Sequence, residues 1–263
     1  MVKKILLALS EVLARSMAKI GNDYQCYCCH KRVGRFLPYR GGMKNISAEM
    51  IRFDVIGSDV EHFSCPYCRS HDRERHLFMY FDKTLIWETF RNSSVLHFAP
   101  ERNLARRIRS LGPKYYVKAD LFPHSAEIVR EDVTRLSFSD EMFDVVIANH
   151  VLEHVSDDTT AMKEVFRVLK PGGLAILQTP FSNILEVTSE DPMITSAAER
   201  LRAYGQEDHV RLYGTDLFTK IEATGLLSLV RTHEDILSDI DSSFFGVNQR
   251  EPFFCYQRPL TSG

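Results

Sequence analysis

The stretch Phe143–Val155, FDVVIANHVLEHV, decides the fold of this chain. Its first half is mostly apolar, as in a strand that is buried on both faces of a parallel sheet. Its second half contains His150, Glu153 and His154 in the order H-x-x-E-H, which is also a zinc-peptidase signature. That signature needs a long helix, whereas the polar residues 156–158 interrupt this segment and begin a new helix. The stretch therefore predicts a buried strand followed by a loop that carries polar groups.

Short apolar runs alternate with amphipathic segments on both sides of this strand. Such alternation predicts an α/β fold in which helices cover both faces of a parallel sheet. Ligands of such sheets bind at the carboxyl ends of the strands. We expect strands at 93–100, 115–122, 127–133, 143–152 and 174–180, helices at 101–112, 158–170 and 215–225, and a turn at 171–173.

Charge is distributed unevenly along the 263 residues. Residues 1–85 carry 14 basic and 9 acidic side chains (+5), and residues 182–263 carry 7 and 13 (−6). The whole chain has a formal charge of −2, which argues against a general affinity for nucleic acid or anionic membranes. The opening 1–22 predicts an amphipathic helix that packs on the protein, with a peripheral membrane contact as the alternative. No apolar run is long enough to span a bilayer, so we expect a cytoplasmic protein.

Five of the six cysteines lie within residues 26–68. Cys26 and Cys29 form one C-x-x-C pair, and Cys65 and Cys68 form a second. Two such turns complete a tetrahedral zinc site that has no open coordination position. The spacing therefore predicts a structural zinc in a ribbon module at 23–72, although disulfides in an oxidising compartment would also use these residues.

A connecting helix is expected at 73–92, with apolar residues including Leu77, Phe78, Phe81 and Leu85 facing inward. Arg73 and Arg75 lie at its start, where they form either a solvated charged face or a grip for a phosphate or carboxylate group of a substrate.

The motifs VLHFAPE, ADLFP, EDVTRLSFSDEMFDVVIANHVLEHV and VLKPGGLAILQTP resemble those of class I S-adenosylmethionine-dependent methyltransferases. Together with the cysteine pairs, the chain resembles a zinc-ribbon-bearing bacterial subgroup associated with surface polysaccharides and small molecules. The resemblance implies a Rossmann-like methyltransferase domain over 93–263 with a substrate lid near 182–214, closed by an antiparallel strand pair.

The resemblance also implies where S-adenosylmethionine would bind. Asp120 would accept hydrogen bonds from the ribose hydroxyls, and Asp132, with Val133 beside it, from the adenine amine. Either aspartate could instead serve only as a helix cap or a turn residue. The first-strand turn departs from the family pattern, because His97 replaces an acidic residue and Ala99-Pro100-Glu101 replaces the glycine-rich run. The implied cofactor residues are His97, Ala99, Glu101, Asp120, Asp132, Val133 and Asn149.

Three histidines are candidates for taking a proton from a hydroxyl acceptor, because imidazole titrates near neutrality. His154 at the sheet edge and His209 in the lid are preferred over His150. His150, Glu153 and His154 are also similar to the divalent-ion ligands of ubiquinone-pathway O-methyltransferases, although those present a carboxylate at the first position.

The lid sequence GQEDHVRLYG contains His209, Arg211 and Tyr213. Arg211 is expected to bind an acidic group of the substrate with Tyr213 close by, unless the loop is ordered only by its own hydrogen bonds. We predict O-methylation of a polar carbohydrate, a nucleotide-linked sugar or another phosphate-bearing metabolite. The alternatives are an RNA methyltransferase with a ribbon that binds the RNA backbone, which the acidic rear argues against, and a non-catalytic scaffold.

Overall fold

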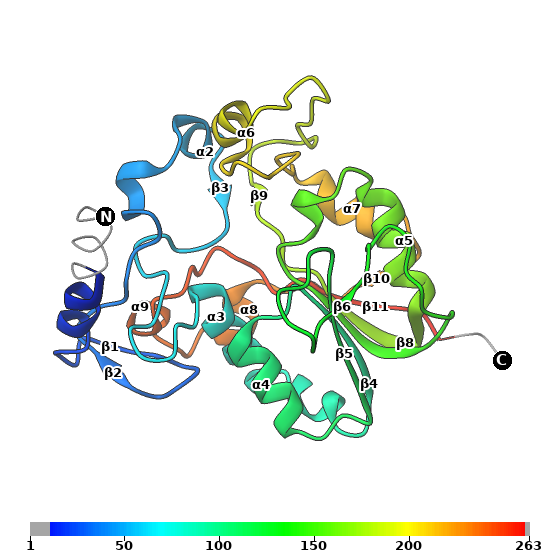
Figure 1. Cartoon of the computed structure of the whole chain (residues 1–263), viewed down its shortest axis with the longest axis horizontal. Helices are drawn as coiled ribbons and strands as arrows, with labels where there is room; N and C mark the ends of the chain where they lie inside the picture. Colours follow the sequence, from blue (N-terminus) through cyan, green and yellow to red (C-terminus); the bar gives the residue numbers. More distant parts are fainter. Residues whose placement is uncertain (1–10, 261–263) are drawn as a thin grey trace.

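The computed structural model describes residues 11–260, and its central feature is a seven-stranded sheet with the order β10-β11-β8-β7-β4-β5-β6 (Figure 1). The pairs β4–β5, β5–β6, β4–β7 and β7–β8 are parallel, whereas β11 is antiparallel to both of its neighbours, β8 and β10. The strands are β4 (Ser94–Phe98), β5 (Tyr115–Asp120), β6 (Val129–Arg130), β7 (Phe143–Ala148), β8 (Leu169–Ile176), β10 (Leu227–Ser228) and β11 (Cys255–Gln257). This arrangement confirms the expected α/β fold and its closing antiparallel pair.

The helices cover both faces of this sheet, as alternation predicted. They are α3 (Asp72–Lys83), α4 (Arg102–Ser110), α5 (Asp158–Val168), α7 (Asp216–Glu222), α8 (His233–Leu237) and the 3-10 turn η2 (Ile86–Phe90). The short helix α9 (Ser242–Phe245) instead contacts β1 (Tyr24–Gln25), and the 3-10 turn η3 (Leu152–His154) follows β7 at the strand end. Side chains alternate between two cores along the central strands: Val145 and Ile147 of β7 pack with α3 and α4, whereas Val146 and Ala148 pack with α5 and α7. Both faces of β7 are therefore buried, which explains its continuous apolar run.

Two expected elements differ in detail. The segment 171–173 is a bulge inside β8 and not a turn before it, because Phe143 pairs with Leu169 while Val145 pairs with Leu174. Gly172 takes a φ of +78°, which glycine adopts without strain. Leu85, expected to face inward, is exposed because α3 ends at Lys83 and the chain turns through Leu85 at a φ of +59°.

The N-terminal helix spans residues 11–18 within the described part of the chain. Val12, Leu13, Met17 and Ile20 of its apolar stripe are 55–78% exposed, so the prediction that this stripe packs on the protein is wrong for these residues. The stripe residues before position 11 lie outside the described residues. No helix among residues 11–260 is both long and apolar enough to cross a membrane.

Residues 23–64 pack beside the carboxyl ends of the sheet strands. They contain β1 (Tyr24–Gln25), β2 (Arg32–Val33), η1 (Gly42–Asn45), α2 (Ala48–Arg52) and β3 (Val55–Ile56). Strand β3 pairs antiparallel with β9 (Phe181–Ser182), which follows β8, and α2 contacts α6 (Ala197–Tyr204) of the segment 182–214 (Figure 1). These two segments therefore face each other above the strand ends.

Candidate functional site

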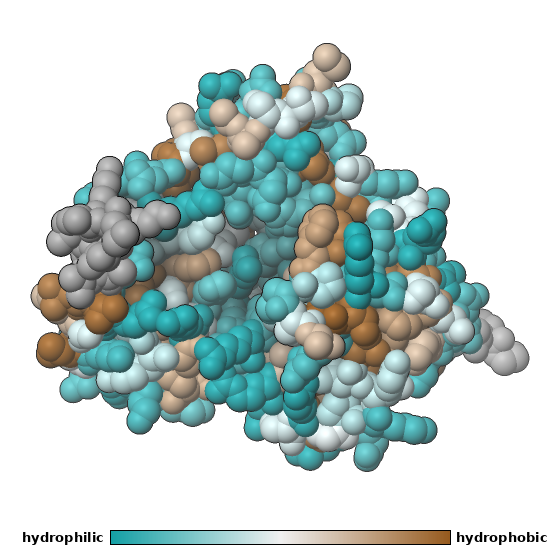
Figure 2. Space-filling view, in the orientation of Figure 1, coloured by the Kyte–Doolittle hydropathy of each residue, from teal (hydrophilic) through white to brown (hydrophobic). Residues whose placement is uncertain are grey.

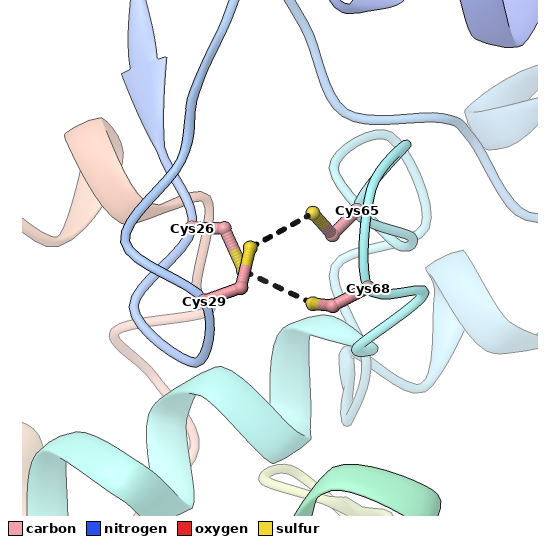
Figure 3. Close-up of side chains that lie close together, drawn as sticks. All are labelled: Cys26, Cys29, Cys65 and Cys68. Atoms are coloured by element: carbon pink, nitrogen blue, oxygen red, sulfur yellow. Dashed lines mark hydrogen bonds between the residues drawn. The ribbon is translucent and has the colours of Figure 1, made fainter.

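The four paired cysteines converge as the sequence predicted. Their sulfur atoms all lie within 4.8 Å of one another, with Cys26 Sγ 3.6 Å from Cys68 Sγ and Cys29 Sγ 3.9 Å from Cys65 Sγ (Figure 3). Four sulfur donors at this spacing match the ligand chemistry of a tetrahedral zinc ion. Cys28 is not part of the set, and it packs half-buried against two of the apolar clusters.

The two cysteine turns have the same backbone construction. In each, the residue after the second cysteine takes a positive φ, +58° at His30 and +62° at Arg69. Its amide donates to the carbonyl of the first cysteine, at 2.8 Å in the first turn and 3.0 Å in the second. The amide of each first cysteine donates in turn to the residue five positions later. Two equivalent turns that aim four thiols at one point are the construction expected of a ribbon module.

The strand order reverses between β4 and β7, and the residues implied to bind the cofactor follow the strands on either side of this point. Asp120 ends β5, where its Oδ1 accepts a hydrogen bond from the amide of Phe122. Asp132 follows β6, and its Oδ1 accepts from the amide and hydroxyl of Thr134. Each aspartate thus serves a turn with one oxygen, while its other oxygen makes no hydrogen bond within residues 11–260. Carboxylate oxygens at these two strand ends fit a nucleoside with a ribose diol and an amine.

The turn after β4 is built around a buried carboxylate. Glu101 Oε2 lies 2.8 Å from His97 Nε2, and its Oε1 accepts a hydrogen bond from Asn149 Nδ2 at 3.2 Å. His97 is fully buried, and its other ring nitrogen lies 2.9 Å from the hydroxyl of Tyr116. The prediction that His97 contacts the cofactor is therefore wrong, because both of its nitrogens are occupied and it positions Glu101 instead.

Two other implied cofactor residues have different surroundings. Ala99 lies exposed at a φ of +43°, the left-handed conformation that the missing glycine would adopt without strain. Val133 is buried in the apolar core, so its side chain is not available to a nucleoside.

A cavity of about 1540 Å³ opens between residues 23–63, the segment 201–212 and the end of the sheet. Figure 2 shows this central hollow with hydrophilic walls. His71, Arg73, His150, Glu153 and His154 belong to its lining, whereas Asp120 and Asp132 do not. The cavity therefore adjoins the polar loop after β7, and the two aspartates lie outside it.

His150 and Glu153 form a buried pair beside this cavity. His150 Nδ1 lies 3.2 Å from Glu153 Oε1, and His150 Nε2 lies 3.9 Å from Oε1 of Glu251. Burial opposes the ionisation of Glu153, but the hydrogen bond from His150 and the neighbouring imidazoles outweigh it and hold its pKa at about 2. His150 also takes a φ of +52°, an unfavourable conformation for a non-glycine residue. A carboxylate that holds one imidazole nitrogen leaves the other nitrogen to accept a proton.

The rings of His154 and His209 contact each other edge to face beside Glu153, with ring centroids 4.7 Å apart. His154 is half-buried, and its Nδ1 lies 3.4 Å from Asp208 Oδ2. His209 is only 5% exposed, and its Nδ1 lies 3.0 Å from the carbonyl oxygen of Tyr204. Burial lowers the pKa of His209 and favours its neutral form.

Arg73 and Arg75 have opposite surroundings although both begin α3. Arg75 is fully buried and donates to the carbonyls of His62, Phe63, Ser70, Phe245 and Gly246. All of its donors are thus used, and the prediction that it binds a substrate is wrong. Arg73 lines the cavity, and its guanidinium group makes no hydrogen bond or ion pair with any of residues 11–260.

Arg211 and Tyr213 also serve the structure. Arg211 is 3% exposed and donates to Glu190 and to the carbonyls of Leu152, Val155 and Ser156. The Tyr213 hydroxyl is buried and donates to Asp158 at 2.8 Å. The segment 182–214 is therefore fastened to the loop after β7, and neither side chain is free to bind an acidic substrate as predicted.

Glu251 is the site residue that sequence reasoning missed. It is 2% exposed, its Oε2 lies 3.7 Å from His76 Nδ1, and its Oε1 faces His150. Glu251 lies just before β11 in QREPFF, where a single charged residue in a loop gives no periodic signal.

The comparisons with known proteins concern mainly the sheet. Residues 91–177 match the methyltransferase domain family. Demethylmenaquinone methyltransferase of Listeria monocytogenes serotype 4a is 34% identical over 83 residues, which are 31% of this chain and 34% of that protein. The Mycobacterium marinum enzyme of the same name is 30% identical over 88 residues, 32% of this chain and 38% of that protein. The chain thus spans about a third of the length of these curated relatives.

Two solved structures are similar at low sequence identity. A putative methyltransferase from Bacillus halodurans is 17% identical, covers 68% of this chain and 97% of its own, and has a TM-score of 0.43. A putative sarcosine dimethylglycine methyltransferase from Galdieria sulphuraria is 14% identical, covers 71% and 87%, and has a TM-score of 0.47.

Proposed function

We propose that this protein is an S-adenosylmethionine-dependent methyltransferase that modifies a polar small molecule held in the central cavity. The match of residues 91–177 to the methyltransferase domain carries the proposal. When bound, S-adenosylmethionine supplies an activated methyl group on a sulfonium centre. The residues of this chain have to bind that cofactor, hold the acceptor and remove its proton.

The cofactor end of the site uses the strand ends β4, β5, β6 and β7. Asp120 and Asp132 would hold the ribose and the adenine with the oxygens that their turns leave free. Glu101, fixed by His97 and Asn149, presents negative charge at the switch point and would bind the ammonium group of the methionine part. The exposed Ala99 is small enough for close approach at the same turn.

The acceptor end of the site uses the cavity. Among the three histidines, His150 is the proton acceptor that the contacts support best, because Glu153 lies against one of its ring nitrogens and orients the ring. This differs from the order expected from sequence, in which His154 and His209 came first. Arg73 supplies a guanidinium group that makes no direct hydrogen bond or ion pair with the described side chains, so it would bind an anionic group of the acceptor. A carbohydrate or nucleotide-linked metabolite with a phosphate or carboxylate has this chemistry.

We also propose that Cys26, Cys29, Cys65 and Cys68 hold one structural zinc in a ribbon module over residues 23–72. The equivalent turns and the convergence of four sulfur atoms support this assignment. The ion would fix the position of the module that walls the cavity and would take no part in methyl transfer.

Calorimetric titration with S-adenosylmethionine tests the proposal without knowledge of the acceptor. We expect binding to the wild type and a loss of roughly 10- to 150-fold in affinity for Asp120→Ala and for Asp132→Ala, the range of one charge-assisted hydrogen bond. Asp140→Ala is the matched control, because Asp140 is an exposed carboxylate that pairs with Arg167. The proposal fails if the wild type does not bind the cofactor, and the placement fails if both variants bind it normally.

A further inference from the structure

A second group of metal-ligating side chains lies apart from the cysteine cluster. Glu153, His154 and His209 each place one potential ligand atom within 4.8 Å of the other two. Glu153 and His154 belong to η3 after β7, whereas His209 follows α6 more than fifty residues later. All three residues line the central cavity.

The backbone holds these two segments in a fixed relation. The amide of Val210, next to His209, donates to the carbonyl of Glu153 at 2.9 Å. Arg211, the following residue, donates to three carbonyls between Leu152 and Ser156. A ligand set needs such support, because coordination tolerates only small displacements of its side chains.

Two of the three side chains are almost completely buried and present atoms with no hydrogen-bond partner in residues 11–260. Glu153 is 1% exposed, its Oε1 faces His150, and its Oε2 is unpaired. His209 is 5% exposed, and its Nε2 is unpaired. Because His209 Nδ1 faces the carbonyl of Tyr204, it carries the proton, and Nε2 therefore has a free lone pair. A hydrogen bond from the second ring nitrogen to a carbonyl is the usual support of a metal-binding histidine.

We propose that Glu153, His154 and His209 bind one divalent transition-metal ion at the wall of the cavity. Two imidazoles and one carboxylate suit zinc, manganese, iron or cobalt, whereas calcium and magnesium prefer ligand sets made of oxygen alone. Three protein ligands leave further coordination positions, which an oxygen of a molecule in the cavity would fill. The site goes beyond the proposed methyl transfer and does not depend on it.

This ligand set differs from the triad of His150, Glu153 and His154 considered from the sequence. His150 Nδ1 contacts the first oxygen of Glu153, and its Nε2 faces Glu251. His150 therefore orients the carboxylate from behind, and His209 supplies the second imidazole. Glu153 can serve both partners because each uses a different oxygen.

Cobalt(II) titration of the full-length protein tests the site, after one equivalent of zinc per chain has filled the cysteine cluster, whose four thiolates are the preferred zinc ligands, so that the second site stays free. We expect one equivalent of cobalt to bind with visible ligand-field absorption but without the intense charge-transfer band of cobalt bound to thiolates. Glu153→Gln and His209→Gln should each weaken cobalt binding at least about tenfold, because each removes a direct ligand. The control variant His124→Gln changes an exposed histidine outside the cavity and should bind like the wild type.

Manganese(II) binding followed by electron paramagnetic resonance provides a second measurement. His154→Gln, which alters the most exposed ligand, keeps the test usable if either buried variant does not fold. The proposal is overturned if the zinc-filled protein binds no further equivalent of either metal. It is also overturned if folded ligand variants bind as tightly as the wild type. Neither measurement uses S-adenosylmethionine or an acceptor, so failure of the metal site and failure of methyl transfer are separate results.

Discussion

Glu74 on α3 is a buried carboxylate that caps the amino end of helix α4. Its Oε1 accepts hydrogen bonds from the amides of Asn103 and Leu104 in the first turn of α4, and its Oε2 accepts from Asn103 Nδ2. Burial raises the pKa of Glu74 to about 7, although these hydrogen bonds oppose the change. Below this pKa Glu74 retains a proton in the folded state that it loses above about pH 4.5 when unfolded.

Glu74 is therefore expected to destabilise the protein as pH rises from about 4.5 to about 7. A raised carboxylate pKa means that the folded state binds more protons in this interval, so stability falls with increasing pH. Urea unfolding at pH 5 and pH 8 should show that Glu74→Gln gains on the wild type by up to about 3 kcal/mol over this range. Asp72, whose pKa burial also raises to about 7, is present in both proteins and cancels. An unchanged difference between the two pH values would contradict the prediction.

His150 is expected to act in catalysis and not in cofactor binding. His150→Gln should lower turnover by about 10²–10⁴-fold, the contribution of a general base, while the affinity for S-adenosylmethionine stays within about twofold. Glu153→Gln should show a smaller loss, because it disturbs the orientation of the ring and leaves the ring in place. Single-turnover kinetics with the genuine acceptor would check this. Less than a tenfold loss for His150→Gln would indicate transfer by positioning alone.

The sequence predicted the positions of residues that follow from the strand pattern, and it failed where a residue's surroundings depend on a distant partner. Asp120 and Asp132 could be placed at strand ends because alternation locates the ends of β5 and β6. Arg75 and Arg211 looked like substrate residues, since nothing local reveals that carbonyls from other segments occupy their donors. Glu251 could not be found at all, because its partner His150 lies about a hundred residues away in sequence.

Among the elements, α3 is the one that joins the ribbon to the rest of the molecule. Arg75 connects carbonyls of 62–70 with those of Phe245 and Gly246 at the carboxyl end of α9. Its guanidinium also lies 3.8 Å from the centre of the Phe36 ring. A single buried side chain thus ties three parts of the chain together.

Arg75→Met should destabilise the protein by at least about 3 kcal/mol, because it leaves several buried carbonyls without donors. Arg75→Lys should lie between this variant and the wild type, since lysine keeps the charge but has three donors. Arg73→Met, two residues away on the same helix, should change stability by less than about 0.5 kcal/mol. Chemical denaturation measures all three. Equal effects at positions 73 and 75 would contradict the assignment of the five carbonyl contacts.

The prediction of elements was accurate for the sheet and poor for the segment above it. Apolar runs located β4 and β7, which are buried on both faces, and alternation located β5, which buries only Val117 and Ala119. Residues 182–214 were expected to be a polar loop, yet they contain α6, which begins with a capping box at Ser196 and Glu199. That helix packs on α2, and a contact between segments so far apart leaves no period in either sequence.

At the scale of the whole molecule, the proposed zinc site and the proposed cofactor site lie in different parts of the structure and are expected to act independently. The ribbon walls the cavity, whereas Asp120 and Asp132 lie outside the cavity lining. Removing zinc with a chelator, or replacing Cys29 by Ser, should lower the melting temperature and expose residues 23–60 to proteolysis. S-adenosylmethionine should still bind within about threefold of the wild-type affinity, because its proposed ligands lie on the sheet. Cofactor binding lost in parallel with zinc would show that the two sites are coupled.

The contacts of Arg75 also bear on the order in which the chain can fold during synthesis. Two of its five acceptors, the carbonyls of Phe245 and Gly246, are made about 170 residues after Arg75 itself. At roughly 5–20 residues per second, about 10–35 seconds pass between the synthesis of Arg75 and the synthesis of its last two acceptor residues. The ribbon and the start of α3 are therefore synthesised first, but their hydrogen bonds through Arg75 are completed last. A ribosome stalled before residue 245 would therefore carry a chain whose first module is still open to chaperones and proteases.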